Sequence, residues 1–144
     1  MTSFEARSVR LSAAVDREFG DGWRLMPRAA GADVDAPAGP DPGRAERDIR
    51  AVYVSSAERL AVPDAYDTRS DRRPGAVMGR PRLEVDARWQ DAALDALHGP
   101  VDARAGDIVR READGTHWRL GPAEPDDMGR RVFPLSRLPD EVTL

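Results

Sequence analysis

The fold of this chain is decided by residues 105–138, which read Ala105-Gly-Asp-Ile-Val-Arg-Arg-Glu112, Ala113-Asp-Gly-Thr116, His117-Trp-Arg-Leu120 and, after a polar loop, Arg131-Val-Phe-Pro-Leu-Ser-Arg-Leu138. Gly106 and Asp107 introduce a short apolar strand. Asp114-Gly115 predicts a type I′ hairpin turn, because these residue types tolerate the positive φ that both central positions need. Trp118 and Leu120 then share one face of the return strand, since side chains alternate along a strand. The stretch therefore predicts three consecutive β-strands.

Apolar side chains of these three strands are the candidate core. We expect the core positions to be Ile108, Trp118, Leu120, Val132 and Phe133.

Residues 3–19 are predicted to form a helix. Thr2 and Glu5 have the spacing of a capping box, in which each side chain accepts a hydrogen bond from the other residue's backbone N–H. The apolar residues Phe4, Leu11, Ala14, Val15 and Phe19 fall near one face at helical spacing. We expect this face to pack over a sheet, the alternative being a docking helix for a neighbouring subunit. Gly20 is expected to end the helix in the left-handed conformation.

Three further strands are predicted over 22–27, 47–56 and 81–89, from alternating or β-branched apolar residues. Two long loops separate them, over about 29–46 and 57–80. Residues 90–98 are ambiguous and favour a short helix. We expect one domain over 1–144, with the helix at 3–19 and the β-strands within about 22–138.

The second long loop carries dense mixed charge, which favours contact with other subunits. The alternatives are a solvated loop and a transient contact with phosphates. The candidate subunit-contact residues are Asp64, Asp67, Arg69, Asp71, Arg72, Arg73 and Arg80.

Composition excludes several classes of protein. The 144 residues contain no cysteine, so disulfide frameworks and thiolate metal sites are excluded. The formal net charge of −4 argues against a dedicated sequence-reading nucleic-acid binder, which needs a basic footprint. All 22 basic residues are arginine, which suits forked ion pairs. No apolar run approaches the ~20 residues that span a bilayer, and the first residues lack a signal-peptide pattern, so we expect a cytosolic protein.

No catalytic or metal-binding pattern emerges. His98 and His117 are the only histidines and are not spaced as a ligand pair. There is no Gly-x-Ser-x-Gly elbow and no phosphate-cradling glycine loop. Asp126 and Asp127 alone fall short of a calcium cage. We expect no enzymatic activity, cofactor or metal.

The order of these features resembles the head–tail joining proteins of lambda-like tailed phages, also called stopper or head-completion proteins, and their relatives in gene transfer agents. The matching pattern is Gly-Asp, an apolar strand, a short turn, a Trp-containing strand, an acidic-Gly loop and a closing strand. Its positions here are Gly106, Asp107, Ile108, Val109, Trp118, Leu120, Asp127 and Gly129. The chain departs from the pattern in its segments at 29–41 and 92–97.

The resemblance implies a mainly β, α+β fold: a small antiparallel β-barrel with an N-terminal α-helix and long loops. It also implies a homo-oligomeric ring, a hexamer in the family, in the virion neck, assembled in the bacterial cytoplasm. The partners would be a portal or adaptor protein and a tail terminator or tail tube protein, with transient, non-specific contact to packaged double-stranded DNA. The alternatives are another neck component, namely a tail terminator or adaptor, or a small β-barrel binding module for nucleic acid.

Overall fold

A computed structural model describes residues 2–55, 80–88, 100–125 and 129–141 of the chain. One helix, α1, precedes nine strands in these residues. Their bounds are α1 Ser3–Phe19, β1 Gly20–Met26, β2 Arg28–Ala29, β3 Gly39–Pro40, β4 Arg47–Val54, β5 Arg82–Asp86, β6 Ile108–Arg111, β7 His117–Leu120, β8 Glu124–Pro125 and β9 Arg130–Arg137.

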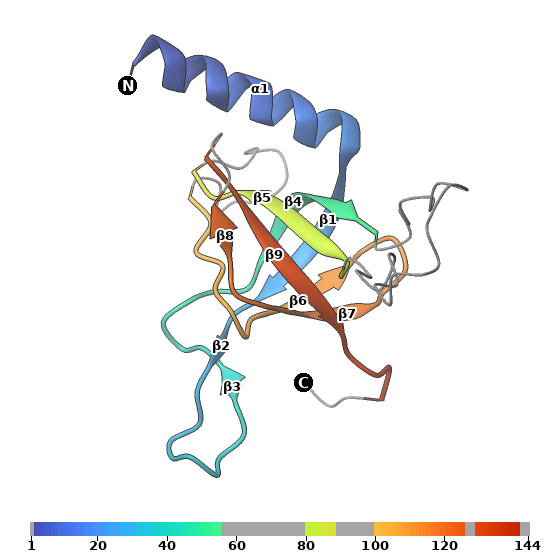
Figure 1. The fold of residues 1–144 in the computed structure, drawn as a ribbon. Helices are drawn as coiled ribbons and strands as arrows, with labels where there is room; N and C mark the ends of the chain where they lie inside the picture. The colour runs from blue at the N-terminus through green and yellow to red at the C-terminus, as the bar shows by residue number, and fades with distance from the viewer. Residues whose placement is uncertain (1, 56–79, 89–99, 126–128, 142–144) are drawn as a thin grey trace, which may run out of the picture.

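Six of the strands close into an antiparallel barrel, and α1 lies across one end of it (Figure 1). The order around the barrel is β5-β4-β1-β6-β7-β9, and pairing of β9 with β5 completes the ring. The registers that close it place Leu83 opposite Phe133 and Leu120 opposite Leu135. The predicted mainly β fold with an N-terminal helix is therefore confirmed, including closure of the barrel.

The barrel interior is filled by alternate residues of each strand. Trp23 and Leu25 alternate with Arg24 in β1, and Ile49 and Ala51 alternate with Arg50 in β4. The remaining buried apolar cluster is formed by Leu83, Val85, Val101, Ala103, Val109, Leu120, Phe133 and Leu135. A period of two with one face buried fixes each register, because a one-residue slip would turn these side chains to solvent.

Strand β9 pairs with three other strands. It pairs with β5 along one edge and with β7 and then β8 along the other. Leu120 lies opposite Leu135 and Glu124 opposite Val132, so four steps on one strand match three on β9. That extra residue makes a bulge between β7 and β8, and bulges of this kind bend a strand at the rim of a barrel.

The turn between β6 and β7 differs from the type I′ prediction. Gly115 has a positive φ of 72°, but it is the only residue of the turn that does. Its N–H donates to the Arg111 carbonyl at 2.8 Å, so Glu112 to Gly115 form a four-residue loop. The Asp114 carboxylate instead accepts from the Thr116 N–H at 2.9 Å and from the Thr116 hydroxyl at 2.6 Å. The hairpin was predicted correctly. The predicted turn type was wrong, because the Asp114 side chain accepts hydrogen bonds from Thr116 and its backbone does not adopt a positive φ.

The capping box at the start of α1 is present as predicted. The Thr2 N–H donates to the Glu5 carboxylate at 2.6 Å, and the Glu5 N–H donates to the Thr2 hydroxyl at 3.2 Å. The end of the helix differs, because Gly20 has an extended φ of −80° and leads directly into β1. Glycine is needed there for a close approach, since a Cβ at this position would collide with the Asp16 carbonyl oxygen.

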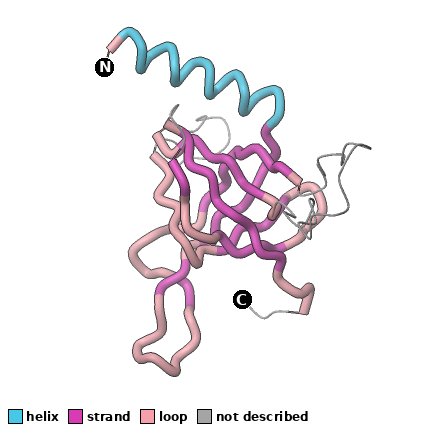
Figure 2. Tube along the Cα trace, in the orientation of Figure 1, coloured by secondary structure: helices cyan, strands magenta, loops and turns pink. Residues whose placement is uncertain are grey.

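The long loop predicted over 29–46 contains a small hairpin of its own. Strands β2 and β3 pair antiparallel, Arg28 with Pro40 and Ala29 with Gly39. Figure 2 shows this hairpin extending from the end of the barrel opposite α1. The predictions for residues 57–79, 89 and 90–98 lie outside the described residues. The barrel thus carries one projecting element at each end.

Candidate assembly surfaces

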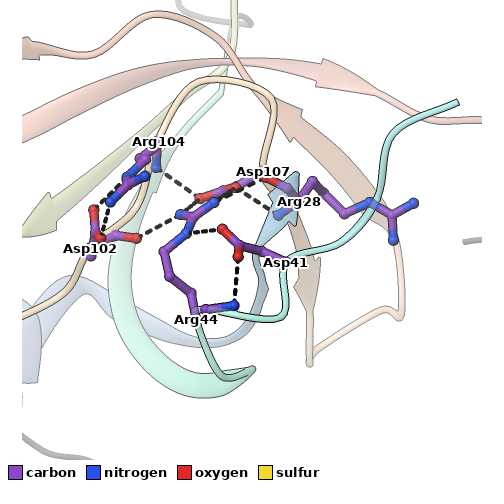
Figure 3. A network of polar contacts seen from close by, with 7 residues as sticks. Arg28, Asp41, Arg44, Asp102, Arg104 and Asp107 are labelled. Atoms are coloured by element: carbon purple, nitrogen blue, oxygen red, sulfur yellow. Dashed lines mark hydrogen bonds and ion pairs between the residues drawn. The ribbon is translucent and has the colours of Figure 1, made fainter. Parts of the chain in front are cut away.

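The base of the β2–β3 hairpin is held to the barrel by one fully buried carboxylate, that of Asp107. Asp107 precedes β6 and accepts four hydrogen bonds (Figure 3). Oδ1 accepts from the Arg28 backbone N–H at 2.9 Å and from Arg44 Nη2 at 2.9 Å. Oδ2 accepts from Arg44 Nη1 at 2.7 Å and from the Arg104 backbone N–H at 2.8 Å. The carboxylate therefore joins three segments that are distant in sequence.

The Arg44 guanidinium donates two hydrogen bonds to this carboxylate, and its remaining N–H groups donate to neighbouring loop residues. Nε donates to Asp41 at 2.6 Å, while Nη1 and Nη2 also donate to the Asp102 and Arg28 carbonyls at 3.0 Å each. All five guanidinium N–H groups thus have a partner, which only a planar fork can achieve. The hydrogen bond to Asp107, followed by the one to Asp41, raises the pKa of Arg44. The Arg44 guanidinium in turn lowers the pKa of Asp41.

The hairpin is therefore oriented by buried charge at its base. Its strands are only two residues long, and such a hairpin has little stability alone. The Asp107 network supplies that stability from outside the hairpin and fixes its direction relative to the barrel. At the hairpin's far end Val34 is fully exposed.

At the opposite end, α1 contacts the barrel through polar side chains. Its buried residues are Ser8, Ser12 and Asp16. Arg130 of β9 donates to the Ser12 hydroxyl at 2.6 Å and to the Asp16 carboxylate at 2.7 Å. Arg88 donates to the Ser8 hydroxyl at 3.2 Å. This polar seam differs from the apolar packing that the helical periodicity predicts.

The pKa values of two carboxylates at the contact between α1 and the barrel are shifted in opposite directions. Burial raises the pKa of Asp16, and the hydrogen bond from Arg130 only partly offsets that rise. Burial also opposes ionisation of Asp86, but hydrogen bonds from Arg88 and Ser12 outweigh it and the pKa of Asp86 is lowered. Asp86 and Arg88 form a bidentate pair, with N···O distances of 3.1 and 2.9 Å.

Three large apolar side chains of α1 are exposed and do not pack on the barrel. Phe4 is 68% exposed, Leu11 56% and Phe19 70%. Three large apolar side chains on one exposed helix are unusual for a surface without a partner. The prediction that this face packs over the chain's own sheet is wrong, because the sheet end beneath α1 presents Arg130, Arg88 and Asp86 instead of apolar residues.

Aromatic residues and one arginine fill the barrel near the β6–β7 turn. The ring centroids of Trp23 and Tyr53 lie 6.0 Å apart, and those of Tyr53 and Trp118 lie 5.9 Å apart. The Arg111 guanidinium carbon sits 4.6 Å from the Tyr53 centroid and its Nη2 bonds Asp21 at 2.7 Å. This cation–π contact covers the cluster at that end of the barrel.

The predicted core residues occupy different positions. Leu120 and Phe133 lie in the buried cluster, and Trp118 is half-buried against it. Ile108 is buried on β6. Val132 is half-buried on the other face of β9 from Phe133, opposite Glu84. Adjacent residues of one strand point to opposite faces, so Val132 and Phe133 do not share the interior.

Most of the predicted subunit-contact residues lie outside the described residues: Asp64, Asp67, Arg69, Asp71, Arg72 and Arg73. Arg80 is described and exposed, just before β5. His117 begins β7, where its carbonyl accepts from the Leu138 N–H at 2.9 Å, and His98 falls in an undescribed segment.

Sequence reasoning missed the role of Asp107. It identified the Gly-Asp pair as the entry to a strand, without the arginine that the carboxylate binds. The available signal was an acid placed directly before Ile108 and Val109, because a charge beside a buried strand needs a partner.

The described residues contain no group of three or more His, Asp or Glu side chains placed to hold a metal ion. Within the same residues, no helix is long and apolar enough to cross a membrane. No protein-family model matches the chain, and no curated protein matches it in sequence.

Proposed function

We propose that this protein is a structural head-to-tail connector, or stopper, of a tailed phage or gene transfer agent. It forms a ring around the DNA channel, between the portal or adaptor and the tail, and it carries out no catalysis. The resemblance that suggests this role lies in the order of features from Gly106 to Gly129, and six copies per ring is the family's arrangement.

The observation that carries the proposal is the exposure of three large apolar side chains on α1. Phe4, Leu11 and Phe19 are exposed while polar residues hold the helix to the barrel. A helix attached in this way presents its apolar side chains to another protein, and their burial is completed in an assembly.

The opposite end of the barrel supports the same reading. The β2–β3 hairpin projects there with a fixed direction, because Asp107 and Arg44 hold its base. A component between two stacked partners needs a contact surface at each end, and the barrel carries one element at each (Figure 1). The net charge of −4 suits a conduit that does not grip the phosphates of passing DNA.

The alternative functions gain less support from the observed fold. An adaptor is expected to be predominantly helical, whereas this chain is mainly β, so a stopper or tail terminator is favoured. A module that binds nucleic acid needs a basic groove with accessible aromatic residues. The groove beside Gly22 is lined by three carboxylates and two arginines, so it is not basic, and the indole of Trp23 is fully buried.

The test is the structure of particles that lack this protein. Negative-stain electron microscopy is expected to show heads, full or leaking, separated from tails. Complementation with the wild-type gene restores joined particles, whereas Phe4→Ser/Phe19→Ser does not. Arg10→Gln, an exposed polar change on the same helix, serves as the matched control and restores joining. Normal tailed particles in the absence of the protein would refute the connector function.

A further inference from the structure

Two opposite sides of the barrel differ in the balance of positive and negative side chains that they expose. In a six-strand barrel, each strand lies opposite its third neighbour, so the β5–β9–β7 side is opposite the β4–β1–β6 side. A ring of identical copies arranged head to tail needs two different surfaces of this kind, one on each side of the subunit.

The β5–β9–β7 side carries exposed arginines on both flanks of β9. Arg82 lies opposite Pro134 of β9, and Arg119 lies opposite Ser136. Pro134 and Ser136 share a face of β9, so both arginines lie on the outer face, one on each flank of that strand. Both are exposed, and neither forms an ion pair with another described residue.

The β4–β1–β6 side has a groove with an excess of carboxylates. It is lined by Gly22, Arg24, Glu46, Asp48, Arg110 and Glu112, together with buried strand residues. Arg24 pairs with Asp48 at 3.1 Å and with Glu46 at 3.6 Å, and Arg110 pairs with Glu112 at 3.0 Å. Within the groove lining, three carboxylates therefore share two guanidinium groups, and each carboxylate is about half exposed. Arg50 lies opposite Gly22 on the same face of β4 but does not line the groove.

The floor of this groove is open to an incoming side chain. Gly22 is exposed, and a Cβ added to it would meet nothing nearer than the Glu112 side chain at 3.8 Å. A long, thin side chain with a charged fork fits a groove with a glycine floor and walls in which carboxylates outnumber arginines by three to two.

We propose that the β5–β9–β7 side of one copy docks on the β4–β1–β6 side of the next, with Arg82 and Arg119 reaching the carboxylates around Gly22. This inference deepens the proposed function and rests on its ring of copies. It names the two surfaces that pair, and it makes assembly sensitive to ionic strength, because exposed charges are screened within about 10 Å at 0.1 M salt.

The test is a charge swap in the full-length protein, followed by sedimentation velocity at low salt. The wild-type protein is expected to assemble and to dissociate as salt is raised. Arg82→Glu/Arg119→Glu and Asp48→Arg/Glu112→Arg are each expected to raise the dissociation constant about tenfold or more, because each places like charges face to face. An equimolar mixture of the two variants is expected to assemble, since every contact in an alternating ring is again between opposite charges.

Arg7→Glu/Arg10→Glu is the matched control, because it makes the same change in net charge at exposed positions of α1. It is expected to leave assembly unchanged, and circular dichroism checks that each variant is folded. If a reversal variant fails to fold, Arg82→Gln/Arg119→Gln is used and is expected to weaken assembly in the same direction.

A wild-type protein that stays monomeric at all concentrations overturns the pairing, as does assembly that the Arg82/Arg119 variant leaves intact or that the mixture does not recover. These outcomes are measured by sedimentation of the purified protein in solution. They are distinct from failure of the connector function, which is read from particles without the protein.

Discussion

Replacing Asp107 by asparagine is expected to destabilise the protein strongly, although the two side chains have the same shape. Asp107 is fully buried and accepts four hydrogen bonds, two of them from the charged fork of Arg44. An amide in its place offers one oxygen and one NH2 group. Two N–H donors then face another donor, and the guanidinium of Arg44 loses its fully buried counter-charge and keeps only that of Asp41.

The magnitude follows from these contacts. Breaking a buried ion pair by removing one charge costs about 3–5 kcal/mol. Domains of this size have unfolding free energies of about 5–15 kcal/mol, so the change removes a large part of the total. The melting temperature is expected to fall by roughly 10 °C.

Urea denaturation followed by far-UV circular dichroism measures this loss. Asp102→Asn is the control, because it makes the same chemical change within the same group of loops. Asp102 pairs with Arg104 at 2.6 Å, but both side chains are more than half exposed, so the cost is expected to stay below about 1 kcal/mol. Equal midpoints for the two variants would refute the conclusion that Asp107 holds the hairpin base.

Three further outcomes are expected. Gly20→Ala is expected to lower the unfolding free energy by about 1–3 kcal/mol in urea titrations, because its Cβ would collide with the Asp16 carbonyl; a neutral result contradicts the close approach. Phe19→Ser is expected to change stability by less than about 0.5 kcal/mol in the same assay, because Phe19 is exposed, and a loss of several kcal/mol would mean that it is core. Folding lowers the pKa of Asp86, so its contribution to the unfolding free energy is fully present above the unfolded pKa of about 3.9 and is lost as pH falls below it. Urea unfolding measured between pH 7 and pH 2 should show this loss of stability, and the Asp86→Asn variant should show a smaller loss.

The helix illustrates what the sequence can predict and what it cannot. The capping box depends on residues three apart, so Thr2 and Glu5 define the start of α1 without any tertiary information. The buried face depends on what lies beneath it, namely Arg130 and Arg88, which are distant in sequence. Apolar periodicity shows that a helix has an apolar face, but it does not show whether that face meets the chain's own barrel or another protein.

The candidate surfaces show the same limit. Alternation around Trp23 and Leu25 predicts a strand with one buried side, and the structure has that strand. The role of Asp107 depends on Arg44, which is 63 residues away, so only the fold brings the pair together. Likewise, Arg82 and Arg119 become neighbours of a single strand only when β9 lies between them.

The position of β9 in the barrel also sets the order in which the protein can mature. Until residues 130–137 have been synthesised, β5 and β7 each retain an edge of unpaired N–H and C=O groups that can recruit another chain. Strand β9, the last of the described strands in chain order, therefore both completes the barrel and removes the edges that favour aggregation. Closure joins residues that are some 50 positions apart, so it is a slow, non-local step in folding. Before β9 pairs, the open edges of β5 and β7 are where a chaperone would protect the nascent chain from aggregation.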